Sequence, residues 1–261
     1  MIPETVHFRP RTGRHETKYV LPSEAVAAAI RDWIEPFTVA DPHAADLPGR
    51  RYSLASLYLD SPALDYYLDT VRGEKNRHKL RIRHYSRPGS PAFFEVKSKV
   101  NDVVLKRRAA VHPEAVAELV AGAVPRRCHL VSGATDALAN LLWFRDFVEG
   151  CTARPTVWVR YSREPRLGVD GNGVRITFDR EVCCCPAAAG SNGHPPAGWH
   201  RAADLPVILE VKFDERLPSW VVAMIRRFDL IRTSVPKYVL SIDACRRLSL
   251  LSTERGVRCF R

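Results

Sequence analysis

Five segments of this chain alternate charged with apolar side chains, and this alternation limits the possible folds more than any other feature of the sequence. Successive side chains of a β-strand point to opposite faces of a sheet, so each segment has one charged and one apolar face. In KLRIRHY, Lys79, Arg81 and Arg83 share one face, and the apolar residues between them share the other. The other four segments are RHETKYV at 14–20, FFEVKSK at 93–99, VRITFD at 174–179 and LEVKF at 209–213.

Two interpretations of this alternation are open. A sheet with a solvated outer face explains it in any single strand, but here the charges are mainly Arg and Lys, and three strands have a Glu two residues before a Lys. The chain also has amphipathic helices that need an apolar surface to cover. A barrel with helices outside and charges inside satisfies both demands. Because its interior cations would repel one another without an anion, a polyphosphate suits such an interior.

Strand and helix patterns follow one another in mixed runs, without a regular βαβ repeat. This order predicts an α+β fold with an antiparallel sheet. We expect one domain over residues 1–261, with its core at about 8–247. Helices are predicted at about 24–35, 63–73, 113–122, 135–150 and 217–230, with a last one within 234–248.

The composition favours an anionic partner. Lys and Arg number 40 and Asp and Glu 29, which gives a net charge of +11 in 261 residues. The pattern does not favour nucleic acid, because the basic residues alternate along strands and are not interleaved with exposed aromatic residues. No apolar run approaches the ~20 residues of a membrane-spanning helix. The N-terminus has no apolar segment of a secretory signal, so we expect a soluble, cytoplasmic protein.

Seven cysteines are present, and three of them are adjacent at Cys183–Cys185. No C-x-x-C spacing occurs, so the usual zinc pattern is absent. Free thiols in a reducing compartment are the favoured interpretation. A metal site with His194 and His200 is the alternative, and the sequence does not assign the triple Cys a role.

Eight segments match a known pattern in their order and spacing: RHETKYVL, SLYLDS, KLRIRHY, FEVKSK, RYSREP, VRITFD, LEVKF and VPKYVLSID. They resemble the VTC domain, the catalytic domain of the vacuolar transporter chaperone polyphosphate polymerases. That domain belongs to the triphosphate tunnel metalloenzyme (CYTH-like) superfamily. The resemblance implies an antiparallel eight-stranded β-barrel tunnel with a charged interior, flanked by α-helices. It also implies a divalent metal, Mn²⁺ or Mg²⁺, and ATP or another triphosphate as substrate.

The resemblance also assigns roles to charged residues of the tunnel strands. It implies that the catalytic cations are Lys18, Arg81, Arg83, Lys97, Arg163 and Arg175. It implies that substrate is also bound by Lys106, Lys212 and Lys237. It implies that Glu210 binds the metal, with Glu16 and Glu95 as further candidate ligands.

One departure from the superfamily pattern bears on function. The superfamily begins with E-x-E-x-K, but Arg14 stands at the first position here, which leaves Glu16 and Lys18. This change weakens a second metal site and favours a VTC-like enzyme over a simple triphosphatase.

The resemblance therefore predicts a metal-dependent polyphosphate polymerase that transfers the γ-phosphate of ATP to a growing polyphosphate chain. Two alternatives use the same residues: a triphosphatase that hydrolyses tripolyphosphate or a nucleoside triphosphate, and a polyanion-binding module without turnover. The chain shows no membrane segment, which leaves open a membrane partner, and the sequence does not set the oligomeric state.

Overall fold

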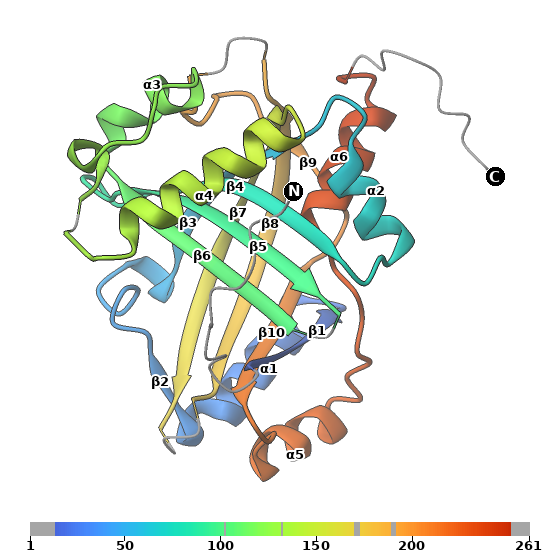
Figure 1. Ribbon diagram of the computed structural model, residues 1–261. Helices are drawn as coiled ribbons and strands as arrows, with labels where there is room; N and C mark the ends of the chain where they lie inside the picture. Colours follow the sequence, from blue (N-terminus) through green and yellow to red (C-terminus); the bar gives the residue numbers. More distant parts are fainter. Residues whose placement is uncertain (1–13, 102, 132, 170–172, 189–191, 252–261) are drawn as a thin grey trace.

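The computed structural model describes residues 14–101, 103–131, 133–169, 173–188 and 192–251. Its centre is one curled antiparallel sheet, in which eight strands follow the order β1-β10-β8-β7-β3-β4-β5-β6 (Figure 1). Two short strands extend the sheet, since β2 pairs with β7 and β9 pairs with β8. Helices flank the sheet, so the fold is α+β and the strands form a half-barrel.

The elements have the following bounds. The strands are β1 (Arg14–Leu21), β2 (Thr38–Ala40), β3 (Tyr52–Asp60), β4 (Arg77–Tyr85), β5 (Ala92–Val100), β6 (Val103–Val111), β7 (Arg154–Gly168), β8 (Arg175–Pro186), β9 (His200–Arg201) and β10 (Val207–Asp214). The helices are α1 (Glu24–Ile34), α2 (Asp65–Arg72), α3 (Val116–Val120), α4 (Ala137–Gly150), α5 (Ser219–Arg227) and α6 (Lys237–Arg247). Short 3-10 turns lie at Glu35–Phe37, Pro48–Arg50, Pro113–Ala115 and Arg127–His129.

An ion pair between distant strands shows how far the sheet curls. Lys97 Nζ of β5 lies 3.9 Å from Glu16 Oε2 of β1, although five strands separate β5 from β1 in the sheet order. Two strands so far apart in a sheet can exchange a side-chain contact only when the sheet bends round and their facing sides meet. The charged face is therefore the concave face, and the alternating apolar face is convex.

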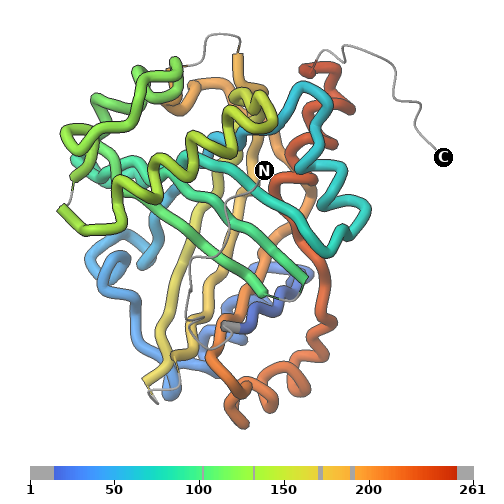
Figure 2. The backbone as a smooth tube through the Cα atoms, viewed as in Figure 1, coloured from blue at the N-terminus to red at the C-terminus, as the bar shows by residue number. Residues whose placement is uncertain are grey.

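The convex side of β4, β5 and β6 packs beneath α4, which crosses these strands in Figure 2. Leu80 and Phe94 are buried there, and the ring of Phe94 meets that of Phe144 edge-on at 5.1 Å. Fully burying one such side chain contributes ~1.5–3 kcal/mol. The apolar half of the alternation therefore attaches this helix to the sheet.

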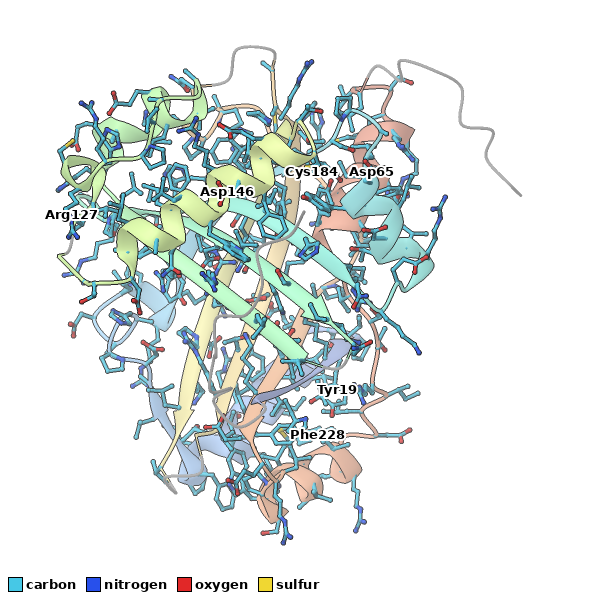
Figure 3. All side chains as sticks on the ribbon, in the orientation of Figure 1. Tyr19, Asp65, Arg127, Asp146, Cys184 and Phe228 are labelled. Carbon is cyan, nitrogen blue, oxygen red and sulfur yellow. The ribbon has the colours of Figure 1, made fainter. Side chains whose placement is uncertain are left out.

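A second convex core joins β1, β8 and β10 to α1 and α5. Ile176 and Leu209 are fully buried against Ile30 of α1 and Met224 of α5. Ser23 caps α1, since its side chain accepts a hydrogen bond from the backbone N–H of Val26, which fixes where that helix begins. Figure 3 labels two other members of this core, Tyr19 and Phe228, which lie near α5.

The third core lies on the concave side, where α6 packs into one end of the half-barrel. Inward-facing residues of β7 and β10, among them Val159 and Ile208, contact Tyr238 and Ile242 of α6. Cys184 of β8, labelled in Figure 3, belongs to this core. The concave face thus has an apolar end covered by α6, next to its charged part.

The structure confirms the predicted fold class: an α+β chain whose eight-stranded antiparallel sheet is curled, has a charged inner face and is flanked by helices. The curl stops at a half-barrel, because no ladder between β1 and β6 occurs among the described residues. The helix predicted at 113–122 is two pieces, a 3-10 turn and α3. Within the described ranges, no helix has both the length and the apolar character needed to cross a membrane.

Candidate active site

The concave face carries its charges in register across neighbouring strands. Lys18 of β1 lies opposite Glu210 of β10, and Arg81 of β4 lies opposite Glu95 of β5. Opposed residues have Cβ atoms ~4.5–5.5 Å apart, so these unlike charges meet. Two groups result. The Glu210 cluster contains Glu16, Lys18, Arg163, Asp179, Glu210, Lys212 and Lys237, and the Glu95 cluster contains Arg81, Arg83, Glu95, Lys106 and Arg108.

Glu210 is buried and contacts cations from three strands. Lys18 Nζ of β1 lies 3.7 Å from its Oε2, Arg163 Nη2 of β7 lies 4.0 Å from its Oε1, and Lys212 contacts the same Oε1. Burial opposes ionisation of this carboxyl group. Lys212, Arg163 and Lys18 outweigh the burial, and they hold the pKa of Glu210 well below its usual range. The group is therefore a carboxylate in spite of its depth.

Glu16 shares the lysines of Glu210. Its Oε1 lies 2.8 Å from Lys18 Nζ, and its Oε2 lies 3.6 Å from Lys212 Nζ and 3.9 Å from Lys97 Nζ. Burial and the nearby Glu210 oppose its ionisation, but these lysines lower the pKa of Glu16 below its ordinary value. The two carboxylates therefore belong to one cluster, with lysines placed between them.

Asp179 anchors the deepest cations of this cluster. Arg163 donates from Nε to Asp179 Oδ1 at 2.6 Å and from Nη2 to Oδ2 at 2.7 Å, and Lys237 Nζ of α6 donates to Oδ2 at 2.7 Å. Burial opposes ionisation, but Arg163 and Lys237 lower the pKa of Asp179. This carboxylate links β7, β8 and α6. Sequence reasoning missed it, although it stands on the charged face of VRITFD.

Glu95 is the centre of the second cluster. Its Oε2 accepts from Arg81 Nε at 2.6 Å, and its Oε1 lies 2.6 Å from Lys106 Nζ. Arg83 and Arg108 lie 4.0 Å and 3.7 Å away. Burial raises the pKa of Glu95, but Arg81, Arg83 and Lys106 outweigh it and hold that pKa far below its usual range. Glu95 is therefore surrounded by cations, and among the described residues its ion-pair partners differ from those of Glu16 and Glu210.

Arg175 lies beside these clusters and pairs with a different carboxylate. It is opposite Lys212 in the sheet register, and its Nη2 lies 3.0 Å from Asp41 Oδ2. The same Nη2 donates to Tyr52 Oη at 3.5 Å. The side chain of Arg14, the departure from the superfamily pattern, lies outside the described residues.

Tyr58 is a second residue that sequence reasoning missed. Its Oη accepts from Arg81 Nη1 at 3.2 Å, and its ring stacks on Tyr238 of α6 at 4.8 Å. Burial opposes ionisation of the phenol, but Arg81 and Arg83 lower the pKa of Tyr58 to about 8. The sequence signal was its position on the inward side of SLYLDS, two residues from Ser56, which accepts from Arg83 Nε at 3.4 Å.

Glu16 and Glu210 fit a hard divalent cation. Glu210 Oε1 is buried and accepts no hydrogen bond; Lys212 and Arg163 contact it only as ions. Mg²⁺ is commonly bound by one or two carboxylates together with substrate phosphates, and Mn²⁺ also prefers oxygen ligands. No group of three or more His, Cys, Asp or Glu that could hold a metal occurs among the described residues. A metal here would therefore share its coordination with phosphate.

Cations outnumber carboxylates on the concave face, and they come from strands all round the curl. Such a surface suits a linear anion with many oxygens, because forked guanidinium groups and lysines can each bind a phosphate. The cations include Lys18, Arg77, Lys79, Arg81, Arg83, Lys97, Lys99, Lys106, Arg108, Arg163, Arg175, Lys212 and Lys237, and the carboxylates include Glu16, Asp41, Glu95, Asp179, Glu210 and Asp214.

Two of the solved structures that match this chain have TM-scores too low to support a conclusion about its fold or function. A chain of the Schizosaccharomyces pombe Mediator head module is 11% identical, covers 93% of this chain and 96% of its own length, and has a TM-score of 0.39. The hypothetical protein NE1496 is 16% identical, covers 80% of this chain and 86% of its own length, and has a TM-score of 0.24. No curated protein matches the chain.

The match to a family model covers most of the chain. The model of the VTC domain matches residues 13–246, which include all the strands of the half-barrel from β1 to β10 and all but the last residue of α6. Both charge clusters lie inside this range. This protein therefore belongs to the VTC domain family.

Proposed function

We propose that this protein is a metal-dependent polyphosphate polymerase, which transfers the γ-phosphate of ATP to a growing polyphosphate chain. The VTC domain family is associated with polyphosphate synthesis, so membership supports a polyphosphate-related function. The observation that carries the finer proposal is the Glu210 cluster, where a buried carboxylate contacts Lys18, Arg163 and Lys212 from β1, β7 and β10.

In this reaction a terminal oxygen of the polyphosphate attacks the γ-phosphorus of ATP, the bond to the β,γ-bridging oxygen breaks, and ADP leaves. Such a transfer depends on positioning and charge neutralisation more than on covalent help from the protein. Arg81 and Arg83 suit this task, because a guanidinium group presents a fixed fork of donors to phosphate oxygens. No Ser, Cys or His nucleophile is needed.

Glu210, with Glu16 beside it, would hold the Mn²⁺ or Mg²⁺, which when bound supplies charge neutralisation to phosphate oxygens. Lys18 and Lys212 contact these same two carboxylates in the structure. If these carboxylates held a metal, the two lysines would be available to phosphate. In this proposal, metal binding and phosphate binding at the cluster would therefore be coupled.

The test is to incubate the protein with ATP and Mn²⁺ or Mg²⁺ and to follow long-chain polyphosphate and ADP. We expect chain product and ADP in parallel, and neither when a chelator replaces the metal. Absence of chain product over a range of metals and primers would overturn the proposal. Anion binding without turnover and without a metal effect would instead indicate a polyanion-binding module.

Hydrolysis is the second candidate, and the exposure of lysines on β5 and β6 favours it. The side chains of Lys97 and Lys106 are 45% and 44% exposed, so water reaches the cations along β5 and β6. Water in place of the acceptor chain would release free phosphate from ATP or tripolyphosphate. The ratio of free phosphate to chain product measures the two activities in one assay.

A further inference from the structure

The three adjacent cysteines of the sequence lie on β8, and the alternation of the strand gives them different surroundings. Cys184 faces the concave side, where it is fully buried in the core that contains α6 (Figure 3). Cys185 faces the other way and packs against the core beneath α4. Cys183 also points away from α6, because neighbouring side chains of a strand point to opposite faces. Of the three, the middle cysteine is therefore the one that meets the helix.

Cys184 faces a second buried thiol, that of Cys245 in α6. Both side chains are fully buried, and their sulfur atoms form a hydrogen bond 3.7 Å long. An S–S bond is ~2.05 Å long, so its formation requires the sulfur atoms to approach by roughly 1.6 Å. Rotation about a Cα–Cβ bond from one rotamer to the next moves a sulfur atom by more than this. Another half-buried cysteine, Cys151, contacts the hydroxyl of Tyr66 instead.

The contact between the two thiols favours Cys245 as the one that reacts first. A thiolate at Cys245 accepts a hydrogen bond from Cys184, and this lowers the pKa of Cys245 below its ordinary value, although burial opposes the effect. The same contact, together with burial, raises the pKa of Cys184. Because the thiolate is the form that reacts with an oxidant, Cys245 is the nucleophile of the pair and Cys184 the thiol that closes the bond.

The position of Cys245 gives a small oxidant a route to a buried thiol. Cys245 stands two residues before Arg247, the last residue of α6, and residues 247–250 are exposed. The ends of helices open more readily than the core of a protein. A brief opening of the last turn is therefore enough to admit a molecule as small as hydrogen peroxide.

A bond at this position would fasten the second end of α6 to β8. At the first end, Lys237 Nζ already donates to Asp179 Oδ2 of β8 at 2.7 Å. Cys245 lies near the other end of the helix, against Cys184 of the same strand. The bond would also close the loop from 184 to 245, and in the chain-entropy account a long closed loop restricts the unfolded chain and stabilises the fold.

We propose that Cys184 and Cys245 are a redox pair, which forms a reversible disulfide in the presence of a peroxide and so clamps α6 to β8. The pair lies outside both charge clusters, so the disulfide requires no part of the proposed function. It gives the middle cysteine of the triple a role that its two neighbours do not share.

The reaction takes two steps. The thiolate of Cys245 attacks one oxygen of hydrogen peroxide, the O–O bond breaks, the sulfur becomes a sulfenic acid, and the other oxygen leaves as hydroxide, which takes up the proton released by the thiol. The sulfur of Cys184 then attacks the sulfenic sulfur, the S–S bond forms, the S–O bond breaks, and water leaves with the proton of Cys184. Both sulfurs are oxidised, and the peroxide is reduced to two molecules of water.

The experiment treats the reduced full chain with hydrogen peroxide and digests it with trypsin under non-reducing conditions. Trypsin places Cys184 in the peptide 181–201 and Cys245 in the peptide 238–246. We expect the wild type to give one joined species, two hydrogen atoms lighter than the summed masses of the two peptides. Dithiothreitol should separate the peptides again.

Variants assign the bond to particular sulfur atoms, because the peptide 181–201 contains all three adjacent cysteines. Cys184→Ala and Cys245→Ala should each abolish the joined species. The matched control is Cys183→Ala, which removes a neighbouring thiol of the same strand that faces away from α6. This control should give the joined species as the wild type does.

Thermal melts test whether the disulfide clamps the helix. The peroxide-treated wild type should melt several degrees above the reduced wild type. Cys184→Ala should melt at one temperature with and without peroxide, which also excludes an effect of oxidation elsewhere in the chain. If Cys184→Ala folds poorly, Cys245→Ala removes the other half of the same pair and serves in its place.

Three outcomes contradict the redox pair. The two peptides stay separate after treatment with excess peroxide, the joined species persists in Cys184→Ala, or the oxidised and reduced wild type melt at the same temperature. The first shows that the thiols do not react with peroxide, and the second assigns the bond to Cys183 or Cys185. The third shows that a bond forms without holding α6 more firmly.

Discussion

At the scale of single residues, the carboxylates that contact the cations are also the ones that we propose as metal ligands. Glu210 illustrates this, because it is buried, ionised and in contact with Lys18, Arg163 and Lys212. Removing its charge should change two properties at once: the affinity for a hard cation, and the balance of charge on the concave face. The two effects can be measured separately.

Glu210→Gln should raise the Mn²⁺ concentration needed for half-maximal activity, since an amide is a poorer ligand for a hard cation. Its melting temperature without metal should fall, because Lys18, Arg163 and Lys212 lose a shared partner. Activity is titrated with Mn²⁺ for the wild type, this variant and Glu215→Gln, a control at an exposed position beyond β10. Superimposable metal curves for Glu210→Gln and the wild type would remove Glu210 from the metal site.

Arg83→Ala should reduce turnover at least about tenfold, because one charge-assisted contact contributes ~1.5–3 kcal/mol and 1.4 kcal/mol is one decade in rate. Arg107→Ala is the control. Arg107 lies on the outward face of β6, and its guanidinium is 4.1 Å from the ring centre of Trp143. The comparison uses initial rates at saturating ATP. Equal rates for Arg83→Ala and Arg107→Ala would mean that Arg83 does not act on the substrate.

His84 gives the chain a stability that depends on pH. Burial and the nearby His194 lower the pKa of His84 to about 4, from an ordinary value of 6.5. The unfolded chain therefore binds a proton between these pH values while the folded chain does not, and stability falls as the pH drops from 6.5 to 4. The loss is at most about 3 kcal/mol.

Urea unfolding of the wild type and His84→Leu at pH 7 and pH 5 measures how much of the stability loss at low pH comes from His84. The wild type should lose more stability than the variant between the two pH values, because leucine cannot take up a proton. Equal losses would show that carboxylates alone account for the acid sensitivity.

At the scale of elements, Asp60 fastens α6 to the start of α2. Its side chain accepts hydrogen bonds from the backbone N–H groups of Tyr66 and Tyr67 at 3.0 Å and 2.9 Å, and from the hydroxyl of Tyr238. A carboxylate at this position satisfies N–H groups that the first turn of a helix leaves unpaired. Through Tyr238, the same carboxylate positions the helix whose first residue, Lys237, points into the Glu210 cluster.

Tyr238→Phe should lower the free energy of unfolding by about 1–2 kcal/mol, since it removes a buried hydrogen bond to a charged group but keeps the ring on Tyr58. Activity should fall with it, because α6 carries Lys237. Tyr67→Phe, which removes a bond to Asp243 in α6, is the comparison. Denaturant midpoints and rates are measured together; unchanged values for Tyr238→Phe would show that Asp60 does not hold α6.

The sequence predicted some elements well and others poorly, for physical reasons. The alternation in KLRIRHY and LEVKF predicted which face of each strand is charged. Side chains of a strand point to alternate faces, so this property depends only on neighbouring residues. The role of α6 was not predictable, since the periodicity of a helix does not say whether it packs on the outer or the inner face of a sheet. The segment predicted as one helix at 113–122 begins as a 3-10 turn at Pro113–Ala115, and α3 ends at Val120, before Gly122 with its positive φ.

The same limit applies to the candidate site. Spacing placed Glu16, Glu95 and Glu210 on charged faces, but it could not show that Glu95 has its own set of cations while the other two share lysines. Asp179 was missed because its importance comes from Arg163 on β7 and Lys237 on α6, which only the tertiary fold brings to it. Which charges meet depends on register and curl, and neither is a local property.

At the scale of the whole molecule, a net charge of +11 predicts that anions stabilise the fold. Saturating tripolyphosphate at about one hundred times its Kd should add ~2.7 kcal/mol. That corresponds to a rise in Tm of several degrees for a chain of this size. Thermal melts with tripolyphosphate and with sodium sulfate at equal ionic strength separate specific binding from screening; equal rises in Tm would show that the cations form no defined site.

The incomplete curl has a mechanical consequence. Neighbouring strands on the path from β1 to β6 are joined by backbone hydrogen bonds, but Glu16 and Lys97 meet across the open side only as charges, 3.9 Å apart. A partly exposed ion pair of this kind contributes ~0–1 kcal/mol and weakens with salt. A phosphate that binds Lys97 takes the place of Glu16 as its partner. We therefore expect a bound anion to fix the distance between β1 and β5, and these two strands to move more freely relative to each other without it.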